Sequence, residues 1–155
     1  MEDEPAHQIA VTRVHVQADV QNDALVRAIE ATLKRQAAAP ARIHLALVTD
    51  EHIAQLNEKH LDHKGATDVL TFDLREKPGG RIEAEIVASV ETARREASRR
   101  GHGLAAELAL YAVHGTLHLL GFDDHVASQA KEMHEIEDEI LSSLGLGRVY
   151  GAAAP

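Results

Sequence analysis

Cysteine and tryptophan are absent from this chain of 155 residues, and aromatic residues make up only 3% of it. Without cysteine, disulfide bonds and thiolate metal sites are excluded, and this usage fits a reducing compartment. With so few aromatic residues, the hydrophobic core has to be built from leucine, isoleucine, valine and alanine.

Long apolar runs are missing as well. No stretch approaches the roughly 18 apolar residues of a membrane-spanning helix. The opening residues are acidic and lack the basic-then-apolar pattern of a secretory signal. We therefore expect a soluble cytoplasmic protein with no membrane partner, folded as one domain over residues 1–155 with its core at about 9–145.

Positive charge is in short supply, with 16 Lys and Arg residues against 25 Asp and Glu residues and a formal net charge of −9. Nucleic-acid binding proteins usually obtain their affinity from cationic contacts with phosphate, so this balance argues against such binding. The 11 histidines and a bound metal ion could still supply positive charge locally.

The hydrophobic pattern predicts an α+β or mixed α/β fold with a four-stranded sheet packed against about five helices. The expected strands cover 9–16, 41–50, 68–74 and 81–90, and the expected helices 22–36, 51–60, 91–101, 104–120 and 126–145. Asn22 or Asp23 is the expected N-cap of the first helix, and Asp50 that of the second. Gly101, Gly121 and Gly145 are expected to end the last three helices.

The segment "HGTLHLLGFDDH", residues 114–125, concentrates metal-binding side chains. His114 and His118 are four residues apart, so on a helix they project from one face and can chelate one ion. Gly121 can turn the chain back and bring a third donor to them. Spacing favours Asp124 as that donor and residue type favours His125, which leaves the two as alternatives.

The same segment has the metzincin spacing without the catalytic glutamate, because Gly115 stands at that position. A metallopeptidase is therefore disfavoured. Activation of a water molecule would have to come from the metal and from whichever of Asp124 and His125 does not bind it.

Three blocks resemble the YbeY family: "HGTLHLLGFDD", "LN…GATDVLTF" at 56–72 and "EIVASVETARREA" at 85–97. The resemblance implies an α+β fold with a metal site at the end of a central helix. It also implies a zinc-dependent endoribonuclease of single-stranded RNA, with one Zn²⁺ or another divalent ion. The implied roles are small-subunit rRNA 3′-end maturation and ribosome quality control, with rRNA, the small ribosomal subunit or its assembly factors as partners. The family's three metal histidines fall on His114, His118 and Asp124.

Two positions depart from the family pattern. The third histidine is replaced by Asp124, with His125 displaced by one residue. The family's arginine falls on Leu61, and His60, His63 or Lys64 is a candidate replacement for it.

A second hypothesis from another class is a ribosome-associated assembly or binding factor with a structural metal. Structural zinc sites are closed by four protein ligands, whereas catalytic sites keep a position open for water. In the structural case His114, His118, Asp124 and His125 would all bind the ion. In the catalytic case His114 and His118 are the residues expected to carry activity.

Other charged or polar residues receive simpler predictions. Glu107, about two turns before His114, is a candidate hydrogen-bond partner of the ligands. His134 is expected at the surface, and Thr67 and Asp68 either cap a strand or take part in catalysis. The arginines of the segment "ARREASRR" are expected on a solvated helix with ion pairs to Glu91 and Glu96.

Overall fold

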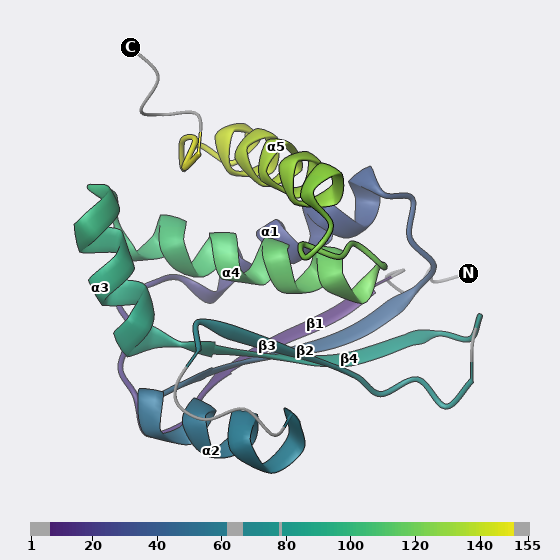
Figure 1. Cartoon of the computed structure of the whole chain (residues 1–155), viewed down its shortest axis with the longest axis horizontal. Coiled ribbons are helices and arrows are strands. Elements are labelled where there is room, and N and C mark those ends of the chain that lie inside the picture. Colours follow the sequence, from purple (N-terminus) through teal and green to yellow (C-terminus); the bar gives the residue numbers. More distant parts are fainter. Residues whose placement is uncertain (1–6, 62–66, 78, 151–155) are drawn as a thin grey trace, which may run out of the picture.

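The computed structural model describes residues 7–61, 67–77 and 79–150, and within them it contains four strands and five helices (Figure 1). The strands are β1 (His7–Arg13), β2 (Ala41–Val48), β3 (Val69–Asp73) and β4 (Ile82–Ser89). The helices are α1 (Asn22–Arg35), α2 (Asp50–Leu61), α3 (Val90–Arg100), α4 (Leu104–Leu119) and α5 (Ala127–Ser143). These elements confirm the predicted α+β architecture.

The sheet is mixed, with the strand order β1-β2-β4-β3. β1 and β4 both run parallel to the central strand β2, and β3 runs antiparallel to β4. Helix α1 supplies the crossover that a parallel connection from β1 to β2 needs. The direction of each strand depends on pairing across the sheet, which hydrophobic periodicity does not report.

The two faces of the sheet are covered by different helices (Figure 1). Ile43, Leu45 and Leu47 of β2 belong to the main core beneath α1 and α4, with α5 packed on the far side of α4. Val48 points to the other face and belongs to a smaller cluster with Ile53 of α2. Successive strand residues therefore serve two separate apolar layers.

Helix α4 is the central helix of the fold and is buried along most of its length. It approaches the sheet closely at Gly115, where an added Cβ would lie 2.9 Å from both Ile86 Cγ2 and Thr71 Oγ1. Only glycine allows this approach without displacing a neighbour. Among the residues that the structure describes, no helix combines the length and apolar character needed to cross a membrane.

The helix ends were predicted with mixed success. The N-cap of α1 is Gln21, without a side-chain cap hydrogen bond, so the prediction of Asn22 or Asp23 is wrong. Asp50 lies in the first turn of α2, and Thr49 Oγ1 accepts the cap hydrogen bond from the His52 N–H at 3.1 Å. These side chains are bound elsewhere: Asn22 accepts from Arg13, Asp23 pairs with Arg27, and Asp50 accepts from Ser89 and Thr92. The predicted helix-ending glycines do adopt positive φ.

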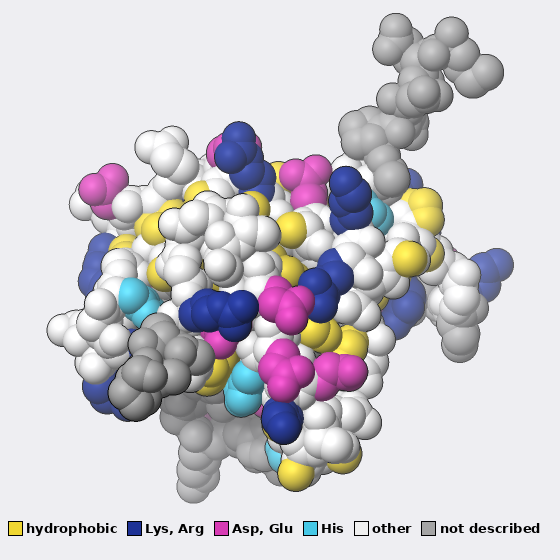
Figure 2. Space-filling model, turned by 90° about the horizontal axis from the view of Figure 1, so that it is seen from above, with side chains coloured by type: hydrophobic (Ala, Val, Ile, Leu, Met, Phe, Trp, Pro, Cys, Tyr) yellow, Lys and Arg dark blue, Asp and Glu magenta, His cyan; other side chains and the backbone are white. Residues whose placement is uncertain are grey.

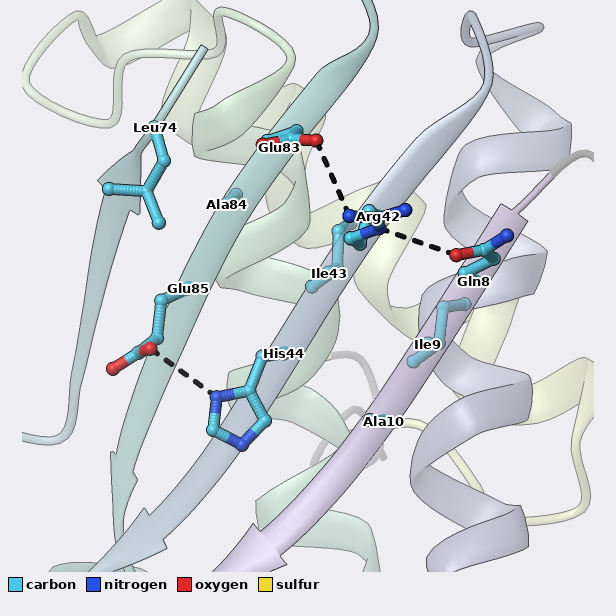
Figure 3. Close-up of a pocket in the computed structure, with 10 residues that line it drawn as sticks. All are labelled: Gln8, Ile9, Ala10, Arg42, Ile43, His44, Leu74, Glu83, Ala84 and Glu85. Atoms are coloured by element: carbon cyan, nitrogen blue, oxygen red, sulfur yellow. Dashed lines mark hydrogen bonds and ion pairs between the residues drawn. The ribbon is translucent and has the colours of Figure 1, made fainter.

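A pocket on the sheet is lined by residues of β1, β2 and β4 together with Leu74, and polar side chains pair across the strands there (Figure 3). There Arg42 of β2 donates to Gln8 of β1 and pairs with Glu83 of β4. His44 and Glu85 form a second cross-strand pair at 3.3 Å. These side chains lie on the face of the sheet opposite to α4.

Candidate metal centre at the end of helix α4

Three donor side chains meet at the C-terminal end of α4: His114, His118 and Asp124, named here the donor cluster. The two Nε2 atoms lie 2.9 Å apart. Asp124 Oδ2 lies 3.4 Å from His114 Nε2 and 3.6 Å from His118 Nε2. One ligand atom from each residue therefore falls within 4.8 Å of the other two, which is compatible with one shared ion.

Local backbone structure brings these residues together. Four-residue spacing on α4 places His114 and His118 one turn apart on the same face. The chain then reverses at Gly121, whose φ of 103° lies in the left-handed region that favours glycine. The Phe122 N–H closes this turn by donating to Leu117 O at 3.1 Å. The reversal returns Asp124 to the two imidazoles.

Hydrogen bonds on the far side of each ring determine which nitrogen faces the cluster. His118 Nδ1 lies 2.9 Å from the carbonyl oxygen of Phe122, and His114 Nδ1 lies 2.7 Å from Glu137 Oε2. Both partners accept hydrogen bonds, so each Nδ1 carries the proton and each Nε2 presents its lone pair. Two lone pairs and a carboxylate oxygen thus converge, an arrangement that a cation stabilises. The residues present fit a metal ion.

The electrostatic environment of His114 is negative. Burial disfavours the charged imidazolium, but the hydrogen bond and charge of Glu137, with the charges of Asp124 and Asp68, outweigh it. The pKa of His114 therefore lies above its ordinary value. The same negative field that attracts a proton to this ring would attract a metal cation.

His125, the alternative third donor, does not join the two helix histidines. Its side chain is 92% exposed, and its Nδ1 lies 3.0 Å from Asp123 Oδ1. The hydrogen bonds from His125 hold the pKa of the Asp123 carboxyl below its usual range. The structure therefore brings Asp124, and not His125, to His114 and His118.

The hydrogen-bond partner of His114 is Glu137 rather than Glu107. Glu107 is fully buried at the other end of α4, where its Oε1 lies 2.6 Å from His102 Nε2 and 3.8 Å from Arg100 Nε. Sequence reasoning overlooked Glu137, which lies on α5 beside the buried Ile136. A carboxylate within the apolar face of an amphipathic helix was the available signal, because such a group requires a partner.

His134 lies at the surface as predicted, with 39% of its side chain exposed, but it also makes contacts that the sequence did not indicate. Its Nδ1 lies 3.1 Å from Glu137 Oε1, and its ring stacks on Tyr150 with centroids 3.8 Å apart. Tyr150 lies in the C-terminal segment that follows α5. Residues distant along the chain from α4 therefore reach the surroundings of the donor cluster.

The arginines of α3 are engaged by protein acceptors. Arg99 and Arg100 pair with Glu96, as expected of a solvated helix. Arg95 pairs instead with Asp50 of α2 at 2.8 Å, and Arg94 donates to the carbonyl oxygen of Gln17. These contacts favour a structural role for this face over phosphate binding.

The segment before β3 is described only in part. Asp68 Oδ1 accepts the Val69 N–H at 2.8 Å, which is the capping arrangement. His60 meets the ring of Phe72 edge-on, with centroids 5.6 Å apart. The side chain of Leu61, at the family's arginine position, and the candidate replacements His63 and Lys64 lie outside the described residues.

The central helix of this α+β fold presents imidazole and carboxylate donors of the kind that hold catalytic zinc in hydrolytic enzymes. The family model described as "Endoribonuclease YbeY" matches residues 8–145 of the chain. The chain belongs to the YbeY family, a family of hydrolytic endoribonucleases.

Individual relatives agree with this assignment. A protein named "Endoribonuclease YbeY" from Moorella thermoacetica is 43% identical over 121 residues, covering 72% of this chain and 78% of the relative. Its namesake from Carboxydothermus hydrogenoformans is 34% identical over 141 residues, covering 89% and 98%. The solution structure of TM1509 from Thermotoga maritima matches with a TM-score of 0.57 at 21% identity, covering 88% of this chain and 91% of that one. This last likeness concerns the fold alone.

Proposed function

We propose that this protein is a metal-dependent endoribonuclease whose ion is bound by His114, His118 and Asp124. The observation that carries the proposal is the convergence of two imidazole lone pairs and one carboxylate oxygen within 4.8 Å. Membership of the YbeY family supplies the reaction class, and the donor cluster supplies the place where it would occur.

Zinc is the ion that this donor set suits best. Two imidazole nitrogens and one carboxylate oxygen are ordinary zinc ligands, and three protein ligands leave a fourth tetrahedral position for water or substrate. When bound, the ion would lower the pKa of a bound water to about 7 and polarise a phosphate oxygen. His114 and His118 are held for this role by Glu137 and by the Phe122 carbonyl group.

We assign the role of proton acceptor to His125. Asp123 Oδ1 accepts the hydrogen bond from His125 Nδ1, so His125 Nε2 presents its lone pair. The side chain is 92% exposed and its Nδ1 lies 3.7 Å from Oδ1 of Asp124, so the imidazole is open to solvent next to a member of the donor cluster. An imidazole is the side chain best matched to proton transfer near neutral pH.

The substrate is single-stranded RNA, and we propose the rRNA of the small ribosomal subunit in the cytoplasm. The proposed roles are maturation of its 3′ end and ribosome quality control. The proposed partners are the small subunit or its assembly factors. Figure 2 shows Lys and Arg side chains interspersed with Asp and Glu on the helix-covered face, rather than a continuous basic surface. Attraction of the phosphate to the metal ion would therefore be an important part of binding.

The two competing functions fit the geometry less well. A structural metal requires four protein ligands, whereas the donor cluster offers three and His125 is hydrogen-bonded to Asp123 instead. A metallopeptidase requires a glutamate at position 115, where even a Cβ would lie 2.9 Å from Ile86 and Thr71. Both observations favour the nuclease.

The proposal is tested with the separate variants His114→Ala and His118→Ala, and with His44→Ala on the opposite face of the sheet as the matched histidine control. Zinc content of the purified protein and cleavage of a labelled single-stranded RNA are measured. Loss of a ligand should weaken zinc binding by more than the roughly 10–100-fold that loss of an outer partner costs, and cleavage should disappear. Retention of both zinc and cleavage in the two site variants would disprove the assignment.

A further inference from the structure

Glu137 contacts two histidines through different oxygens. Its Oε2 lies 2.7 Å from His114 Nδ1, and its Oε1 lies 3.1 Å from His134 Nδ1. The side chain of Glu137 has no solvent exposure. A buried carboxylate bound on both sides has little freedom to rotate, so the position of one histidine depends on the other.

The second histidine is itself covered by the C-terminal segment. The ring of Tyr150 stacks on His134 at 3.8 Å with an interplanar angle of 29°, and Arg100 lies over the Tyr150 ring at 5.6 Å from its centroid. The backbone N–H groups of Val149 and Tyr150 donate to Asp138 Oδ1 at 2.6 and 2.9 Å. Residues 149–150 are thereby fastened to the same helix that carries Glu137.

These contacts form an ordered series that begins at Tyr150, passes through His134 and Glu137, and ends at His114. We propose that Glu137 is a positioning residue for the metal site, and that His134, stacked on Tyr150, keeps the Glu137 carboxylate in place. This inference rests on the proposed function and extends it to the C-terminal segment. By accepting the hydrogen bond from His114 Nδ1, Glu137 keeps Nε2 free to bind the ion and fixes the plane of the ring.

A purely structural role for Glu137 predicts a different behaviour. In that case the carboxylate would only satisfy two buried donors, and its replacement would lower the stability of the metal-free protein without a specific effect on zinc binding. In the positioning role, the tautomer of His114 and the affinity for zinc change together. Both quantities can be measured on the full chain.

The decisive variant is Glu137→Gln, compared with Glu139→Gln. Glu139 lies on the same helix and pairs with Arg35 at the surface, so its replacement removes the same charge without touching the donor cluster. A glutamine amide can accept from only one of the two histidines through its oxygen, and its N–H groups favour the opposite tautomer in the other. We expect zinc affinity, measured by chelator competition, to fall by about 10–100-fold in Glu137→Gln and to stay unchanged in Glu139→Gln.

Nitrogen NMR of the metal-free protein reports the tautomer directly. At a pH above the raised pKa of His114, where the ring is neutral, the wild type and Glu139→Gln should show His114 protonated at Nδ1, whereas Glu137→Gln should show a shift toward Nε2. A role confined to stability would leave this ratio unchanged.

A second pair of variants keeps Glu137 and changes Tyr150, the residue whose ring stacks on His134. Tyr150→Phe retains the stacked ring and removes only the hydroxyl, whereas Tyr150→Ala removes the ring itself. Zinc affinity should be unchanged in Tyr150→Phe and lowered in Tyr150→Ala, by less than in Glu137→Gln. If Glu137→Gln does not fold, this pair still tests whether the contacts from Tyr150 to His114 affect zinc binding.

The outcomes separate the two proposals. Wild-type protein that does not bind zinc would overturn both the metal-dependent function and this inference. Zinc binding by the wild type with equal affinity in Glu137→Gln and Glu139→Gln would overturn the positioning role alone. Equal affinity in both Tyr150 variants would remove the C-terminal segment from the series.

Discussion

Near each end of α4 a buried glutamate is bound to a histidine, but of these two pairs only the one at the C-terminal end lies beside further metal-binding donors. At the C-terminal end, Glu137 lies 2.7 Å from His114. At the N-terminal end, Glu107 lies 2.6 Å from His102. Both carboxylates are fully buried, so burial and pairing alone do not distinguish the two regions.

The difference lies in what surrounds each pair. His114 is bound through Nδ1, and its Nε2 meets His118 and Asp124. His102 is bound to Glu107 through Nε2, and a cation, Arg100, already lies near the carboxylate. The free nitrogen of the first pair therefore faces further donors that could share an ion, whereas the second pair has a protein cation beside its carboxylate.

The largest effect is expected when the third donor is removed. Asp124→Ala should weaken zinc binding by about 100-fold or more, because it deletes a ligand rather than an outer partner. His125→Ala should leave zinc affinity unchanged, since His125 is bound to Asp123 and is not one of the three converging donors. Chelator competition on both variants measures this. The reverse ranking would make His125 the third ligand.

The N-terminal end of α4 should respond in stability rather than in metal affinity. Glu107→Gln removes the charge that faces His102 and Arg100, and should lower the free energy of unfolding by about 1–3 kcal/mol. Zinc affinity of the folded protein should remain that of the wild type. Denaturant titration of metal-free protein, with chelator competition beside it, makes the test. A loss of zinc affinity would show that the two ends of α4 are coupled.

Helix α4 packs closely on the sheet at Gly115, and one added methyl group there would disturb this contact. Gly115→Ala places a Cβ against Ile86 and Thr71, so we expect a loss of about 1–3 kcal/mol in the free energy of unfolding. Gly103→Ala, at the N-terminus of the same helix, meets no atom within 4 Å and serves as the control. Equal stability of the two variants would contradict the tight contact.

Asp50 provides a partly exposed carboxylate to set beside the two buried ones. Burial opposes its ionisation, but hydrogen bonds from Ser89, Thr92 and Arg95 outweigh burial and hold the pKa of Asp50 below its ordinary value of 3.8. A lowered folded pKa means that the stabilisation is present above about pH 4 and is lost as the pH falls through the folded pKa.

Asp50→Asn should therefore cost about 1 kcal/mol in the free energy of unfolding at neutral pH, and progressively less at acidic pH. The measurement is a series of denaturant titrations across this pH range, with Asp19→Asn as a carboxylate control. A difference between Asp50→Asn and wild type that does not change with pH would argue against the ionised form of Asp50 as its source.

Much of the fold could be predicted from the chain alone, since each element follows from local pattern. Periodicity located the four strands and five helices, four-residue spacing placed His114 and His118 on one helix face, and Gly121 indicated the reversal after the helix. Hydrophobic pattern and turn preference depend on residues close in sequence, which is why they can be read without a structure.

Contacts between distant segments were decided only in three dimensions. Spacing and residue type left Asp124 and His125 as alternatives, and the exact path of the reversal after Gly121 selects Asp124. Glu137 and Tyr150 reach the site because α5 packs against α4 and the last residues fold back on α5. The amino-acid sequence thus determined which donors were available, whereas the tertiary packing decided which of them meet, because a hydrogen bond depends on distance in space.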